Sequence, residues 1–285
     1  MKYVKNNFAN ALGLLAIVGL IFKAFIGQNL SINENLIERT LTSYIIAYLA
    51  FKISYMETKK VGLIFVPLIF HSLVMAIVVR GGFSQKIPSD MVQIITTLYK
   101  LLVMVGVFFA IELFFNRLLG SLATSILGGI SLIIFIAISF SKKLAILEAF
   151  EDFFLYFSFY VMAIRVRSAS SLNPLLLVLG LILVAGEMYI KEKYIKIDYG
   201  FLFSIFPLSY LALKTVSRES AFDLIDHLIF ALIYIYPALF VIIKASLDIE
   251  MLAISIIAIL ASYIIGQGIF KIKNKYLSYL LLGIN

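Results

Sequence analysis

Long apolar segments, separated by short stretches of charged and turn-forming residues, make up nearly the whole of this chain. Hydrophobic residues account for 62% and charged residues for only 14% of the 285 positions, whereas soluble domains hold roughly 45–50% and 25%. A soluble fold of this length cannot hide so much apolar side chain, because too much of its surface faces water. The composition therefore predicts an integral membrane protein.

Ten of these apolar segments approach or reach the length of about 20 residues that a helix needs to cross a bilayer. No stretch between them is long enough for a soluble domain, so we expect an all-α protein with one transmembrane domain. Lys and Arg are somewhat more frequent in one set of alternating connections, which predicts a multi-pass plasma-membrane protein with both termini in the cytoplasm. The predicted spans are 8–28, 40–56, 61–80, 91–114, 118–140, 145–164, 172–190, 200–214, 221–243 and 251–270.

Glycine, proline and charged landmarks of the first half recur in the same order in the second half. Glu112, for example, recurs 138 positions later as Glu250. We therefore predict two five-helix repeats, 1–138 and 139–285. Because each repeat has an odd number of spans, the second one enters the membrane from the opposite side, and the two are inverted repeats.

Three stretches carry a pattern of acids, glycines and a proline. IELFFNRLLGSLATSILGGISLII has Glu112 at the end of the fourth predicted span and Gly120 and Gly129 in the fifth. YPALFVIIKASLDIE has Pro237 ahead of Glu250, and LSYLALKTVSRESAFDLIDHL carries small residues after a basic turn. Together they resemble the ten-helix, EamA-like branch of the drug/metabolite transporter superfamily. The Trp-Gly pair common in that family's first helix is missing, because the chain has no Trp.

This resemblance implies a secondary transporter or exporter of a small polar or amphipathic metabolite, working by alternating access, with proton coupling as one option. Two other functions stay open: an intramembrane enzyme acting on a lipid-like substrate, and a non-catalytic membrane scaffold. The sequence has no Gly-rich phosphate loop, nucleophile elbow or metal-ligand motif, so we expect neither a cofactor nor a metal. Basic cytoplasmic loops explain the net charge of +8 better than a nucleic-acid partner does. The expected partners are the bilayer and a small-molecule substrate.

Polar side chains inside the spans are the candidates for chemistry, since a charge at the bilayer centre costs about 2.5–3.5 kcal/mol. His71 follows Pro67 by four residues, and a similar kinked, polar segment follows Pro207. We expect these two segments to face each other at a binding site. The cavity candidates are His71, Tyr99, Lys100, Tyr156, Ser209, Tyr210, Tyr234 and Tyr236.

Acidic residues at the starts of the sixth and ninth spans form a second group. Spacings of three and four residues put their side chains on one helix face, which suits a proton or cation site. The same acids also suit an ordinary helix start, where they complement the helix dipole. The coupling candidates are His71, Glu148, Asp152 and Asp226. Lys23, near the end of the first span, is interpreted as a lysine that reaches the membrane surface.

Overall fold

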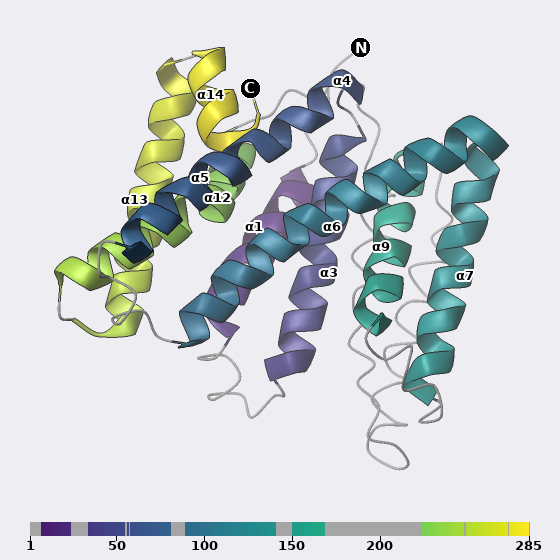
Figure 1. The fold of residues 1–285 in the computed structure, drawn as a ribbon, viewed down its shortest axis with the longest axis horizontal. Coiled ribbons are helices and arrows are strands. Elements are labelled where there is room, and N and C mark those ends of the chain that lie inside the picture. The colour runs from purple at the N-terminus through teal and green to yellow at the C-terminus, as the bar shows by residue number, and fades with distance from the viewer. Residues whose placement is uncertain are drawn as a thin grey trace. The chain divides into compact units, whose positions relative to one another are not determined.

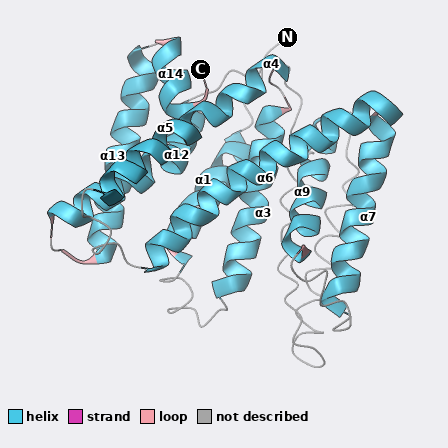
Figure 2. Cartoon of the chain, viewed as in Figure 1, coloured by secondary structure: helices cyan, strands magenta, loops and turns pink. Residues whose placement is uncertain are grey.

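Every regular element that the computed structural model describes is a helix (Figures 1 and 2). The described residues are 7–23, 34–54, 56, 58–80, 89–140, 150–168, 224–247, 249–272 and 274–284. The helices are α1 (Asn7–Ile21), α3 (Glu34–Ile53), α4 (Thr58–Val61), the 3-10 helix η1 (Gly62–Phe65), α5 (Val66–Arg80), α6 (Ser89–Leu119), α7 (Ser121–Phe140), α9 (Glu151–Ser168), α12 (Leu224–Ser246), α13 (Met251–Ile272) and α14 (Lys275–Leu282). The predicted all-α class is confirmed for this part of the chain.

Eight of the ten predicted spans coincide with a described helix or helix pair. The predicted spans 172–190 and 200–214 lie outside the described residues, so the ten-span count stays a prediction. The helix α14 lies outside every predicted span, because its eight residues are too short for one, and the four residues of α4 reach the third span only at Val61. The ends of α14 are set locally: Asn274 accepts hydrogen bonds from the N–H groups of Tyr276 and Leu277, and Gly283 ends the helix with φ +71°.

Three described helices hold segments long and apolar enough to cross a membrane. They are Ile95–Leu119 in α6, Leu224–Lys244 in α12 and Met251–Ile272 in α13. Shorter apolar helices cover Asn10–Ile21, Gly62–Val74 and Ser121–Phe135. These lengths and compositions suit a protein associated with a membrane.

The described helices fall into two compact units, each of which takes helices from both predicted repeats. The first unit holds α1, α3, the part of α6 from Val103 onward, α7 and α9. The second holds α4, η1, α5, the part of α6 up to Leu102, α12, α13 and α14. This division differs from the predicted repeats 1–138 and 139–285, whose equivalence stays a prediction.

In the first unit, α9 packs between α3 and α7, and α1 packs on α3 (Figure 1). A side chain at Gly128 of α7 would lie 2.7 Å from Val161 of α9, so the glycine is what lets these helices approach closely. The second part of α6 packs on α9 through Phe108, whose ring meets those of Phe153 and Phe157. A close approach at glycine therefore joins α7 to α9, and aromatic packing joins α6 to α9.

Polar contacts fix the helix directions in the first unit. Lys23, at the end of α1, pairs with Glu38 in the first turns of α3, so these helices are antiparallel. Arg39 joins the start of α3 to the start of α9, and these two run the same way. At the other end, Arg165 of α9 donates to the carbonyl of Ser121 at the start of α7, so α7 and α9 are antiparallel.

In the second unit, α12 and α13 are antiparallel and share the most extensive helix contact (Figure 1). The buried face of α13 is made largely of small residues, namely Ser255, Ala258, Ser262 and Gly266. Its exposed face is large and apolar, and Ile264 for example is 68% exposed. Small residues inside and large apolar residues outside are typical of helices that pack in lipid.

The third predicted span is irregular at its start. The short helix α4 leads into it, η1 forms its first turn, and Pro67 lies in the first turn of α5. Residues in the first turn of a helix donate no hydrogen bond within it, so the missing N–H of Pro67 breaks no bond of α5. The irregular turn lies before the proline and not after it. The end of α14 packs here: a side chain at Gly283 would lie 2.7 Å from the Cα atom of Ile64.

Candidate functional site

Two of the predicted cavity residues, His71 and Tyr234, meet inside the second unit. Their rings are stacked with centroids 5.9 Å apart, and both side chains are buried. The Tyr234 hydroxyl donates to the carbonyl of Ile64. In a 3-10 helix each carbonyl accepts a hydrogen bond from the N–H three residues later, which for Ile64 would be that of Pro67. Proline has no N–H, so this bond cannot form. Tyr234 thus supplies the donor that the backbone lacks.

His71 joins α5 to the C-terminal helix. Its Nε2 lies 3.2 Å from the carbonyl oxygen of Leu281 at the end of α14. Because a carbonyl can only accept a hydrogen bond, Nε2 carries the proton and Nδ1 of the neutral ring is an acceptor. The imidazole is therefore held in one tautomer and orientation.

Tyr99 of α6 is the third predicted residue in this neighbourhood. It lies close enough to Tyr234 for an electrostatic interaction. Its hydroxyl oxygen is buried and has no hydrogen-bond partner among the described residues. A buried hydroxyl without a partner costs about 1–3 kcal/mol, so this group is available to a ligand. We call His71, Tyr99 and Tyr234 the α5–α6–α12 cluster.

Lys100 and Tyr236 take other positions in the second unit. The Lys100 side chain is exposed, although it follows Tyr99 directly. Tyr236 is buried and hydrogen-bonds with Ser255 of α13, so it helps to join α12 to α13.

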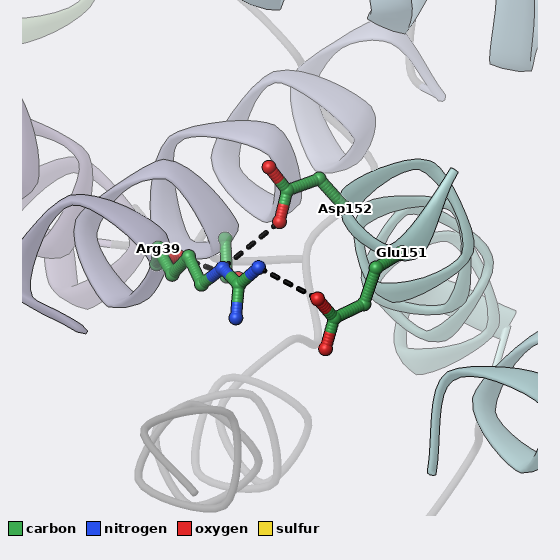
Figure 3. Close-up of polar contacts among 4 residues, drawn as sticks. Arg39, Glu151 and Asp152 are labelled. Atoms are coloured by element: carbon green, nitrogen blue, oxygen red, sulfur yellow. Dashed lines mark hydrogen bonds and ion pairs between the residues drawn. The ribbon is translucent and has the colours of Figure 1, made fainter. Parts of the chain in front are cut away.

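The first unit holds an ion cluster where α3 meets α9 (Figure 3). Arg39 Nη2 lies 2.8 Å from Glu151 Oε2, and Arg39 Nε lies 2.9 Å from Asp152 Oδ1. Both acids stand in the first turn of α9, where they also complement the helix dipole. The predicted coupling residue Asp152 is thus bound to an arginine.

Arg39 precedes the second predicted span, and its surroundings favour its charged form. Burial lowers the pKa of Arg39, but the neighbouring charges of Asp152 and Glu151 outweigh burial and raise it above its ordinary value. Tyr156, one turn along α9, is buried and interacts electrostatically with Asp152 and Arg39. Lys23, whose side chain is only 4% exposed, pairs with Glu38 at the same end of α3, so its interpretation as a lysine that reaches the membrane surface stays a prediction.

A second polar cluster in the first unit surrounds Glu112 of α6. The Tyr160 hydroxyl of α9 donates to Glu112 Oε2 over 2.9 Å, and Asn116 Nδ2 donates to Oε1 over 3.2 Å. Thr124 Oγ1 of α7 donates to Asn116 Oδ1 over 2.7 Å. We call Glu112, Asn116, Thr124 and Tyr160 the Glu112 network. Glu250, its counterpart in the predicted repeat, is exposed, and the Glu250 carbonyl accepts the Ile254 N–H at the start of α13.

The remaining predicted residues divide between buried and undescribed positions. Asp226 is fully buried in the first turn of α12. Glu148, Ser209 and Tyr210 lie outside the described residues. Within the described ranges, no three His, Cys, Asp or Glu side chains come together in a way that could hold a metal ion.

Sequence reasoning missed the residues that complete these clusters. Asn116 and Thr124 are uncharged and eight positions apart, and nothing in the pattern links them. Arg39 stands in a connection just before the second predicted span, where a basic residue is common in membrane proteins. An acid and an arginine at the starts of two spans on the same side could have indicated the α3–α9 ion pairs.

No family model matches this chain, and neither a curated protein nor a solved structure matches it.

Proposed function

We propose that this chain is an integral membrane protein that carries a small polar or amphipathic metabolite across the plasma membrane. It would act as a secondary transporter or exporter by alternating access. The observation that carries the proposal is the α5–α6–α12 cluster. There the buried Tyr99 hydroxyl, without a described partner and on a helix long enough to span, lies near Tyr234, whose ring stacks on the oriented imidazole of His71. Such convergent polar groups among apolar helices suit a small-molecule site.

The apolar outer faces support placement in a bilayer. On α7 the residues Leu122, Ile126, Ile130 and Ile133 are exposed, while Thr124, Gly128 and Ser131 are buried. In water this distribution would expose a large apolar patch. In a bilayer this apolar face contacts the hydrocarbon of the lipid, so its exposure is not unfavourable.

The helix directions of the first unit support the predicted membrane topology. Alternate crossing requires the first and fifth spans to run one way and the second, fourth and sixth to run the other. In the first unit α1 and α7 run opposite to α3 and α9, and the end of α6 lies beside the start of α7. With the N-terminus in the cytoplasm, the Arg39 ion cluster would lie at the outer surface.

Ligand screening on the purified full-length protein tests the proposed site. Amino acids, amines, nucleosides and sugars would be added in turn, and compounds that raise the unfolding temperature would be tested for uptake into proteoliposomes. Loss of one hydrogen bond, at about 0.5–1.5 kcal/mol, predicts that Tyr99→Phe weakens binding roughly two- to tenfold. Tyr276→Phe, which alters an exposed tyrosine of α14, is the matched control.

The outcomes separate the three functions. Uptake that is impaired by Tyr99→Phe and His71→Ala but not by Tyr276→Phe supports transport through this site. Normal uptake by both site variants contradicts it. Chemical conversion of an added lipid-like compound would favour an enzyme, and neither binding nor uptake of any compound would favour a scaffold.

A further inference from the structure

Glu112 is an acid in the last part of a segment long enough to cross a membrane, Ile95–Leu119, and its side chain is half-buried. Both of its carboxyl oxygens accept hydrogen bonds, and both donors are neutral groups, the Tyr160 hydroxyl and the Asn116 amide. Tyr160 and Thr124 are buried. Residues of α6 and α9 therefore bind this carboxyl group directly, and Thr124 of α7 joins through Asn116.

The charged and titratable groups nearby make no ion pair with Glu112 among the described residues. Arg117 lies five residues further along α6, about 140° round the helix, and is exposed. Arg165 of α9 donates to the carbonyl of Ser121. The helix α7 carries no titratable side chain between Ser121 and Phe140.

The acids at the start of α9 are too distant to neutralise or repel Glu112 strongly. Glu151 and Asp152 precede Tyr160 by eight or nine residues, which is about 12–14 Å along the helix, and both bind Arg39. Tyr156 stands between the two clusters and interacts with the Arg39 group. The charge of Glu112 is thus balanced by no fixed cation among the described residues.

We propose that Glu112 is a proton-binding site, whose proton is exchanged during the transport cycle. An ionised side chain costs about 2.5–3.5 kcal/mol at the centre of a bilayer and less toward its surface, and a protonated carboxyl group carries no charge and costs less than a carboxylate at either depth. The Glu112 network suits both states, because amide and hydroxyl groups can reverse their roles. When Glu112 gains a proton, its O–H donates to a turned Asn116 amide oxygen, and the Asn116 NH₂ then donates to Thr124 Oγ1. The proton comes from water and returns to it, so no other reactant is needed.

Infrared difference spectroscopy tests proton binding directly, without any substrate. Full-length protein in liposomes is taken through steps of pH, and the carbonyl band of a protonated carboxylic acid is followed. We expect a band that grows as pH falls, that disappears in Glu112→Gln and that persists in Glu250→Gln. Glu250 is the matched control because it is exposed at the α12–α13 connection. A band that persists in Glu112→Gln, or no titrating band at all, overturns the proposal.

A second variant covers the case in which Glu112→Gln does not fold, as judged by circular dichroism and gel filtration. Tyr160→Phe keeps the carboxyl group and removes one hydrogen bond, so the frequency of the band should change, while Glu250→Gln leaves it unchanged. An unchanged frequency in Tyr160→Phe overturns the arrangement. Sodium in place of potassium should not shift the titration, and a shift would assign the site to sodium instead.

The role in coupling rests on the proposed transport function and has its own readout. With a transported compound from the screen, Glu112→Gln should still exchange it but should lose the accumulation driven by a pH gradient. Accumulation by Glu112→Gln that still follows the gradient overturns the coupling role. Absence of any transport would contradict the proposed function, whereas the infrared result would stand by itself.

Discussion

Arg39 shows how single residues hold the first unit together. Its guanidinium binds two carboxylates of another helix, at 2.8 Å and 2.9 Å, while the side chain is 30% exposed. Partial exposure screens the attraction, so the contribution of these pairs is moderate. Removal of the arginine costs more than the pairs contribute, because two acids are then left together without a cation.

We expect Arg39→Leu to lower the free energy of unfolding by about 1–3 kcal/mol. The measurement is thermal unfolding in detergent micelles, followed by circular dichroism. Arg117→Leu, at an exposed arginine, should have little effect. If Glu151→Gln and Asp152→Asn are added to Arg39→Leu, part of the loss should return. A triple variant as unstable as the single one would contradict the ion-pair interpretation.

Tyr99 and Tyr234 form a matched pair with opposite expectations. Tyr234→Phe removes the donor to the Ile64 carbonyl and should cost about 1–3 kcal/mol of stability. Tyr99→Phe removes a hydroxyl that has no described partner and should leave the unfolding temperature unchanged or raise it. Equal destabilisation by both substitutions would show that Tyr99 is structural.

At the scale of elements, small residues decide which helix faces meet. Gly128 lies against Val161, and Gly266 lies against Ala231 and the carbonyl of His227. The neighbour of the first, Gly129, has open space around it. The sequence pattern selected Gly129 as a landmark, but the helix contact belongs to Gly128.

This pair of adjacent glycines gives a test of the α7–α9 packing. Gly128→Ala should destabilise the protein by about 1–3 kcal/mol, because the new Cβ is too close to the stiff, β-branched Val161. Gly129→Ala should be neutral or stabilising by up to about 1 kcal/mol, because alanine favours the helix. Unfolding temperatures of the two variants settle the order, and the reverse order would contradict the contact.

At the scale of the whole molecule, the membrane topology connects the described helices to the predicted spans that lie outside them. The connection α6–α7 follows the fourth predicted span, and the connection α12–α13 follows the ninth. Five crossings separate the two connections if the predicted spans 172–190 and 200–214 both cross. An odd number of crossings places the connections on opposite sides.

Cysteine labelling tests this count, and the chain has no cysteine of its own. Ser246→Cys should react with a membrane-impermeant maleimide on intact cells. Ser121→Cys should react only after the membrane is made permeable. Both serines are exposed in their connections. Labelling of both from one side would refute the ten-span arrangement, and labelling of Ser121→Cys alone would reverse the orientation.

The positions of most helices were predictable because each one satisfies its own backbone. In lipid, N–H and C=O groups must bond within the helix, so a long apolar segment bounded by polar residues is sufficient to indicate one. Apolar length does not indicate α14, which depends on an asparagine cap and a glycine end. For the candidate site, the sequence selected His71, Tyr99 and Tyr234 individually, but nothing in it linked Glu112 to Tyr160.

For the described residues, the sequence by itself determined an all-helical structure with helices suited to a membrane and with a few polar side chains inside them. Tertiary structure decided which of these side chains meet. Tyr234 bonds to Ile64 across 170 positions, and Tyr160 bonds to Glu112 across 48. Such pairings depend on how each helix is rotated against its neighbours. Small residues and close packing between helices set that rotation. It therefore cannot be predicted from the apolar pattern of any one helix.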